Sequence, residues 1–145
     1  MTMTLGKAIA LAAAAHRDET DSKSGEAYML HVMRVVLAVR GGKERIVAAL
    51  HDVVEHVEGW SFERLASEGC DAETVAAVDA LTRRDGEAYL DFAKRAAANA
   101  LARPVKIADL RDNLAAVLEH EPEETREEKA RKYREALSLI GAAED

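Results

Sequence analysis

Four side chains of the types that bind divalent metals stand at separate places along the chain: His31, the dipeptide His51-Asp52, and Asp109. Each interrupts an apolar stretch, and an ionised aspartate among apolar residues is costly to bury without a cation or several hydrogen bonds. Two imidazoles and two carboxylates suit Mn²⁺, Fe²⁺, Zn²⁺ or Mg²⁺. The sequence therefore predicts that these side chains converge on a mononuclear or binuclear metal centre. Taken singly, His31 is also compatible with a hydrogen-bonded core histidine.

Glu55 follows the dipeptide at helical spacing. It stands four residues after His51 and three after Asp52, so one continuous helix would place the three side chains on one face. Near a cation that polarises a phosphoryl oxygen and lowers the pKa of bound water, Glu55 can accept a proton or position the nucleophile. His56 is five residues after His51, about 140° further round the helix, which excludes the zinc-protease arrangement of two histidines on one face.

Apolar periodicity and turn residues predict an all-α chain of about seven or eight helices. Aromatic residues make up only 4% of the sequence, which favours close-packed helices over a sheet. A polar, turn-rich loop is expected between the first two helices, and Ser61 and Asp71 are expected N-caps. The predicted helices cover about residues 4–16, 27–39, 43–56, a short segment after Ser61, 71–83, 87–98, 105–119 and 122–141.

Length and charge restrict the class of protein. A chain of 145 residues predicts one domain, residues 1–145. The net charge of −7 disfavours nucleic-acid polymers and anionic membranes as partners, while a small anionic ligand remains compatible with a local cluster of basic groups. The single cysteine excludes an internal disulfide, and we expect a cytoplasmic protein without a signal peptide or membrane span. The sequence does not define an oligomeric state, and a homo-oligomer is compatible with it.

Over about residues 5–115 the chain resembles the hydrolase domain of the RelA/SpoT family, especially its small stand-alone HD-domain members. The matching segments are Ala15-His16, the loop Lys23-Ser24-Gly25-Glu26-Ala27-Tyr28, the run Ala49-Leu50-His51-Asp52-Val53-Val54-Glu55, Leu81-Thr82-Arg83-Arg84, and Val105 to Asn113. The resemblance implies an HD-domain helical bundle, bound Mn²⁺, and hydrolysis of the 3′-pyrophosphate of (p)ppGpp to GDP or GTP and pyrophosphate.

The resemblance also assigns roles to individual residues. It makes His31, His51, Asp52 and Asp109 the metal ligands, and Glu55 the first member of a catalytic acidic pair. Lys23 and Ser24 fall in the nucleotide-binding loop, and Asn113 falls near the nucleotide. The residue types add two basic candidates: Lys106, as a phosphate contact or a structural ion-pair partner, and Arg83, as a phosphate contact or a solvated helix-end residue.

Two positions depart from the family pattern. His56 stands where the second acid of the pair is expected, and Ser22 replaces a basic residue before Lys23. His56 is either a second titratable catalytic group or an exposed helix-end residue. Three hypotheses follow: an alarmone phosphohydrolase, a phosphohydrolase of another phosphorylated nucleotide or dinucleotide cofactor, and a module that senses a nucleotide without hydrolysing it.

Overall fold

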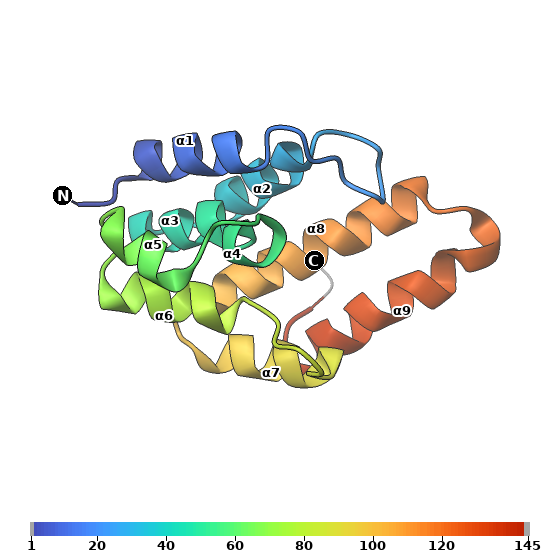
Figure 1. The fold of residues 1–145 in the computed structure, drawn as a ribbon. Coiled ribbons are helices and arrows are strands. Elements are labelled where there is room, and N and C mark those ends of the chain that lie inside the picture. The colour runs from blue at the N-terminus through green and yellow to red at the C-terminus, as the bar shows by residue number, and fades with distance from the viewer. Residues whose placement is uncertain (1, 144–145) are drawn as a thin grey trace.

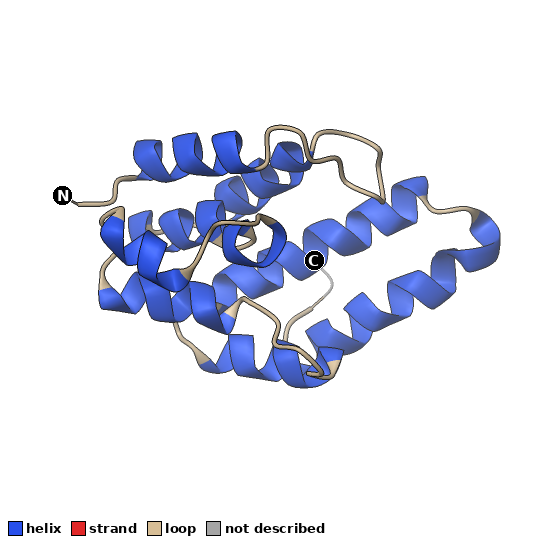
Figure 2. Cartoon of the chain, viewed as in Figure 1, coloured by secondary structure: helices blue, strands red, loops and turns tan. Residues whose placement is uncertain are grey.

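The computed structural model describes residues 2–143, which form nine helical segments and no strand (Figures 1 and 2). An isolated bridge pairs Thr20 with Ala27 in the loop between the first two helices. No helix in the described part is long and apolar enough to cross a membrane. The segments are α1 (Leu5–Ala15), α2 (Tyr28–Ala38), α3 (Gly42–Leu50), α4 (Val53–His56), α5 (Phe62–Ser67), α6 (Ala72–Ala80), α7 (Tyr89–Ala98), α8 (Arg103–His120) and α9 (Glu123–Leu139).

The helices are arranged around two groups of buried apolar side chains. α3 packs against α1, α2 and α6, and side chains such as Val47 and Leu50 are fully buried there. α8 runs beside α2 at one end of this group and packs against α7 and α9, where Leu110, Leu114 and Leu137 form the second group (Figure 1). α8 therefore links the two groups, and it brings Asp109 next to α2 and α3.

Local sequence signals position several helix ends as expected. Ser61 and Asp71 are the N-caps of α5 and α6, because their side chains accept the backbone N–H groups of Arg64 and Thr74. Thr4 caps α1 in the same way by accepting from the backbone of Lys7. The predicted helices at both ends of the chain and the polar loop after α1 are confirmed.

The predicted continuous helix over residues 43–56 is wrong at its centre. α3 ends at Leu50, His51 and Asp52 form a turn, and a single-turn helix, α4, starts at Val53. Asp52 has φ −109° and ψ 0°, which departs from helical values. This break turns the Asp52 carboxylate away from a helix face, and it also explains why nine segments replace the predicted seven or eight.

Arg95 connects α7 to the loop before it. Its guanidinium donates to both carboxylate oxygens of Glu87 at 2.8 Å and to the carbonyl oxygens of Asp79 and Thr82. The hydrogen bonds from Arg95 outweigh the desolvation of Glu87 and lower its pKa to about 2. The stabilisation from the ion pair between Arg95 and Glu87 is therefore fully present above about pH 4.5, the usual pKa of this carboxyl. It is lost as the pH falls toward 2 and Glu87 is protonated.

We expect Arg95→Ala to lower the free energy of unfolding by about 1–3 kcal/mol at pH 7, and by less at pH 3. Urea unfolding of both proteins at the two pH values measures this difference. Arg131→Ala on the exposed face of α9 is the control and should change stability by less than about 0.5 kcal/mol. A cost of Arg95→Ala that is the same at both pH values would contradict the assignment to Glu87.

Candidate metal centre and anion-binding cavity

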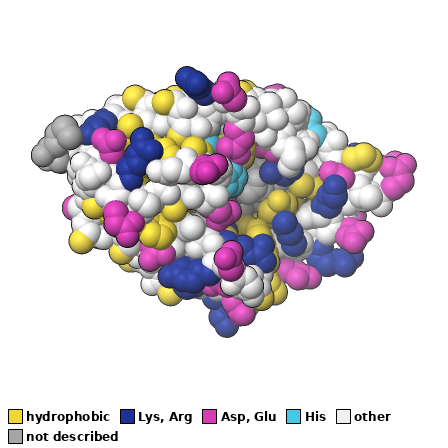
Figure 3. Space-filling model, viewed as in Figure 1, with side chains coloured by type: hydrophobic (Ala, Val, Ile, Leu, Met, Phe, Trp, Pro, Cys, Tyr) yellow, Lys and Arg dark blue, Asp and Glu magenta, His cyan; other side chains and the backbone are white. Residues whose placement is uncertain are grey.

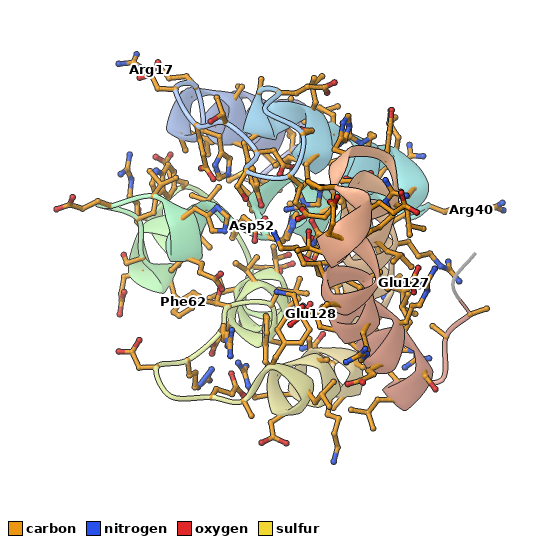
Figure 4. All side chains as sticks on the ribbon, turned by 90° about the vertical axis from the view of Figure 1, so that its right-hand side faces the viewer. Arg17, Arg40, Asp52, Phe62, Glu127 and Glu128 are labelled. Carbon is orange, nitrogen blue, oxygen red and sulfur yellow. The ribbon has the colours of Figure 1, made fainter. Side chains whose placement is uncertain are left out.

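The four predicted metal-binding side chains meet in one place. His31 comes from α2, His51 and Asp52 from the turn between α3 and α4, and Asp109 from α8, and one ligand atom from each lies within 4.8 Å of all the others. Asp52 lies at the centre of the molecule, between the helices, whereas Arg17 and Arg40 point outward (Figure 4). The turn after Leu50 is what directs Asp52 toward α2 and α8.

Three distances between these atoms match those of ligands around one ion, and a fourth, from His31 Nε2 to Asp52 Oδ2, is longer at 4.0 Å. His31 Nε2 is 3.0 Å from Asp109 Oδ1, and His51 Nε2 is 3.0 Å from Asp52 Oδ2 and 3.4 Å from Asp109 Oδ1. Ligands at about 2.0–2.2 Å from a shared metal lie roughly 3.0–3.5 Å apart. The buried Nε2 of His51 has no hydrogen-bond partner among the described residues. The four atoms therefore fit a divalent cation.

The opposite ring nitrogen of each histidine is fixed by a hydrogen bond. His51 Nδ1 donates to the carbonyl oxygen of Ala48 at 2.6 Å, and His31 Nδ1 donates to Asp112 Oδ2 at 2.6 Å. Arg34 holds Asp112 from the other side at 2.7 Å. These bonds direct both Nε2 atoms toward the carboxylates, which is the usual arrangement around metal-binding histidines.

Charge within the cluster also favours a cation. Burial lowers the pKa of His31, but hydrogen bonds to Asp109 and Asp112 outweigh burial and raise the pKa to about 9. Burial raises the pKa of Asp109, but the hydrogen bond from His31 and the nearby cationic groups of Lys106 and His51 reverse this and hold it well below its usual value. The carboxylates therefore favour positive charge at the two imidazoles, whose pKa values are both raised, and one divalent cation would balance the same charge.

Tyr28 and Asn113 hold the two aspartates. The Tyr28 hydroxyl donates to Asp52 Oδ2, and Asn113 Nδ2 donates to Asp109 Oδ1 at 3.3 Å. Burial and the nearby carboxylates raise the pKa of Tyr28 well above its usual value, so its hydroxyl remains a donor. Asn113 therefore lies beside the site, as predicted. Tyr28 makes a contact with Asp52 that the sequence pattern did not indicate.

Glu55 and His56 stand at the edge of the cluster. Glu55 Oε1 accepts the backbone N–H of Arg83 at 2.8 Å, and its Oε2 lies 3.8 Å from His56 Nε2. His56 Nδ1 donates to Glu19 Oε2 at 2.7 Å, so its Nε2 faces Glu55 and, at 3.9 Å, Asp52 Oδ1. His56 is therefore an exposed residue at the end of α4 whose Nε2 edge faces the candidate metal centre.

A cavity of about 330 Å³ opens from the metal centre and is lined by Lys23, Lys106 and Lys132, together with Tyr89 and Tyr133. Figure 3 shows basic side chains around a hollow on this face, close to a histidine. Lys106 is buried, with Nζ 4.0 Å from the centre of the Phe92 ring and 3.8 Å from Asp109 Oδ2. Lys106 thus reaches both the cavity and a carboxylate of the candidate metal centre.

Lys132 lies outside the predicted set. It has no carboxylate within ion-pair distance in the part of the chain that the structure describes, and its Nζ lies 4.9 Å from the centre of the Tyr89 ring. Partial burial, followed by the charges of Lys23, Arg83 and Lys106, lowers its pKa. Lys23 lies 3.1 Å from Asp21 and Lys106 lies 3.8 Å from Asp109, so among the described residues Lys132 is the cavity lysine left for an anionic ligand.

Two predicted substrate contacts lie outside this cavity. Ser24 lines a separate depression beside Asp112, where its Oγ accepts the backbone N–H of Glu26 at 3.2 Å. Arg83 lines a more open cavity of about 580 Å³ that shares Glu55 with the first, and its guanidinium donates to the carbonyl oxygen of Glu87. The structure therefore brings together the four predicted metal ligands, Glu55, His56, Lys23, Lys106 and Asn113, whereas the side chains of Ser24 and Arg83 lie outside this cavity.

Comparison with known proteins identifies the fold. No family model and no curated protein matches the sequence. Among solved structures, the chain is similar to a metazoan ortholog of SpoT, described as hydrolysing ppGpp and as playing a role in starvation responses. The two share 21% identity at a TM-score of 0.80, over 97% of this chain and 87% of that chain. The predicted all-α HD-domain bundle is confirmed.

Proposed function

We propose that the protein is a metal-dependent phosphohydrolase that removes the 3′-pyrophosphate of (p)ppGpp, giving GDP or GTP and pyrophosphate. The observation that carries this proposal is the convergence of two imidazole nitrogens and two carboxylates at the inner end of a lysine-lined cavity. The ppGpp hydrolase of the same fold supports the choice of substrate. We take residues 1–145 to act as a single HD domain on a small soluble nucleotide.

His31, His51, Asp52 and Asp109 would hold the metal, for which Mn²⁺ is our first choice. Bound there, the ion would polarise a phosphoryl oxygen and lower the pKa of a bound water. Glu55 Oε2 would accept the proton of the attacking water, since Oε1 is engaged with the backbone of Arg83. His56 would assist through Nε2, whose orientation is fixed by the hydrogen bond from Nδ1 to Glu19.

The lysines would bind the phosphates of the substrate. Lys106 is nearest to the metal centre and is suited to the pyrophosphate that leaves. Lys23 and Lys132 also line a second cavity of about 310 Å³, next to the first. A nucleotide with phosphate groups at two positions could therefore contact basic side chains at both ends, which favours a bis-phosphorylated substrate over one with a single phosphate.

Product analysis tests the proposal directly. Purified protein supplied with Mn²⁺ should release pyrophosphate from ppGpp and leave GDP. If the protein instead released orthophosphate from another phosphorylated nucleotide and left ppGpp intact, the second hypothesis would hold, and the substrate would be that nucleotide. Tight binding of ppGpp without turnover, with turnover gained in His56→Asp, would instead support a nucleotide sensor, because it would trace the missing activity to this departure from the family pattern.

Lys132→Gln tests the proposed role of the Lys132 charge in binding the substrate. We expect KM for ppGpp to rise about fivefold with little change in kcat, because one exposed cation contributes about 1 kcal/mol to binding a phosphate group. Steady-state kinetics at low ionic strength measures both constants. Lys94→Gln on the exposed side of α7 removes the same charge away from the cavity and should change neither. Equal effects of the two substitutions would contradict a local role for Lys132.

A further inference from the structure

We propose that His16, Glu19 and His56 form a second site for a divalent transition metal, of the Zn²⁺ class, which fastens the loop over residues 17–27 to α4. The inference goes beyond the proposed function: it shares His56 with the proposed catalytic residues, but it concerns a second ion and does not depend on which substrate is hydrolysed. One ligand atom from each residue lies within 4.8 Å of the other two.

Glu19 lies between the two imidazoles. Its Oε1 is 2.8 Å from His16 Nδ1, and its Oε2 is 2.7 Å from His56 Nδ1. Ligand atoms around one ion are separated by about 3 Å when each metal–ligand distance is about 2.0–2.2 Å. Small movements of the side chains therefore suffice to replace the two ring protons by one ion. Two imidazoles and a carboxylate make a donor set that zinc and related ions favour.

The pair of rings is held in place before any ion binds. His16 is 1% exposed, and its ring packs against that of Tyr28, with the centroids 5.2 Å apart. The ring of Tyr28 also lies 5.0 Å from that of His56. The side chains of His56 and Glu19 are 28% and 29% exposed. The site thus has a closed side formed by His16 and an open side from which an ion and a water ligand can enter.

The surroundings of this cluster are acidic. In the described residues Glu19 forms ion pairs with His16 and His56 and with no lysine or arginine. On its other edge, His56 faces the carboxylates of Asp52 and Glu55 at 3.9 and 3.8 Å. This concentration of negative charge, without a basic side chain to balance Glu19, attracts a cation.

An ion at this place would connect the loop to the first metal centre. The loop is closed on itself by backbone hydrogen bonds from Asp21 to Glu26 and from Tyr28 to Glu19, and it carries Lys23 into the cavity. α4 begins directly after Asp52. Linking Glu19 and His16 to His56 would therefore hold Lys23 at a fixed position relative to the metal-binding carboxylate.

Metal stoichiometry tests the inference without reference to activity. Chelator-stripped protein is titrated with Zn²⁺ by calorimetry and with Co²⁺ by visible absorption, and bound metal is counted after gel filtration. We expect two equivalents in the unaltered protein and in Glu26→Gln, a control in the same loop. We expect one equivalent in Glu19→Gln and one in Asp109→Asn, because each removes a ligand from a different site. Circular dichroism confirms that the variants are folded.

The outcomes separate this site from the first one. A single equivalent that is lost in Asp109→Asn and kept in Glu19→Gln overturns the second site and leaves the first intact. A single equivalent that is lost in Glu19→Gln and kept in Asp109→Asn supports the second site and contradicts the metal centre of the proposed function. If two equivalents bind, amide exchange over residues 17–27 should slow several-fold with the second equivalent. An unchanged exchange rate would overturn the fastening of the loop.

Discussion

Replacing Asp52 with asparagine should lower kcat/KM for pyrophosphate release from ppGpp by at least about 10³-fold, or about 4 kcal/mol. Asp52 Oδ2 lies 3.0 Å from His51 Nε2 and accepts from the Tyr28 hydroxyl. An amide in this place can still accept from Tyr28, but it carries no charge to offset a divalent ion. We therefore expect the variant to remain folded and to lose both metal and activity.

Metal content and product formation are measured on the same preparations of both proteins. Asp91→Asn, at an exposed position in the first turn of α7, removes one carboxylate away from the cluster and serves as the matched control. It should keep the bound metal and the rate of hydrolysis. Full activity of Asp52→Asn with bound metal would show that the ion is held by other side chains, and the proposed centre would be wrong.

The helices were predictable because their signals are local. The apolar stripes of the first and last helices, and the caps at Ser61 and Asp71, depend on neighbours within one or two turns. The turn at His51-Asp52 was not predictable in this way. The surrounding residues favour continuation of the helix, and the stretch after it supports only the single turn of α4.

That break changes how the site is assembled. A continuous helix over residues 43–56 would have aligned Asp52 and Glu55 by spacing alone. In the structure the turn directs Asp52 to the cluster, while Glu55 is held by the backbone of Arg83 from another segment. Asp52 and Glu55 were brought together as predicted, but by tertiary contacts rather than by the expected helical face.

The contacts that support the candidate metal ligands could not be inferred from local sequence patterns. Asp112 reaches His31 across 81 positions of the chain, and Tyr28 reaches Asp52 across 24. Pairs so distant in sequence are defined only when α2 packs against α8 and the turn forms. Lys132 was missed for a different reason. It lies beyond the resemblance, on a helix whose many charges gave no sign of which one faces the cavity.

Glu55→Gln separates proton transfer from metal binding. We expect kcat to fall by about 10²–10⁴-fold, the usual contribution of a general base, with metal content unchanged. The amide oxygen of glutamine can still accept the Arg83 N–H that Glu55 Oε1 accepts at 2.8 Å, so the loop before α7 keeps its contact. Only the capacity of the other oxygen to take a proton is lost. Single-turnover kinetics with bound metal measures the chemical step directly.

Two further variants make the result specific. Glu58→Gln, on the exposed stretch after α4, should leave kcat unchanged, which excludes a general effect of lost charge. His56→Asp introduces the acid of the family pattern beside Glu55. If Glu55 is the base and Nε2 of His56 assists it, Glu55→Gln lowers kcat in either background. The opposite result would be an unchanged kcat in Glu55→Gln and a large loss of kcat in His56→Gln. In that case His56, whose ring is oriented by Glu19, would be the general base.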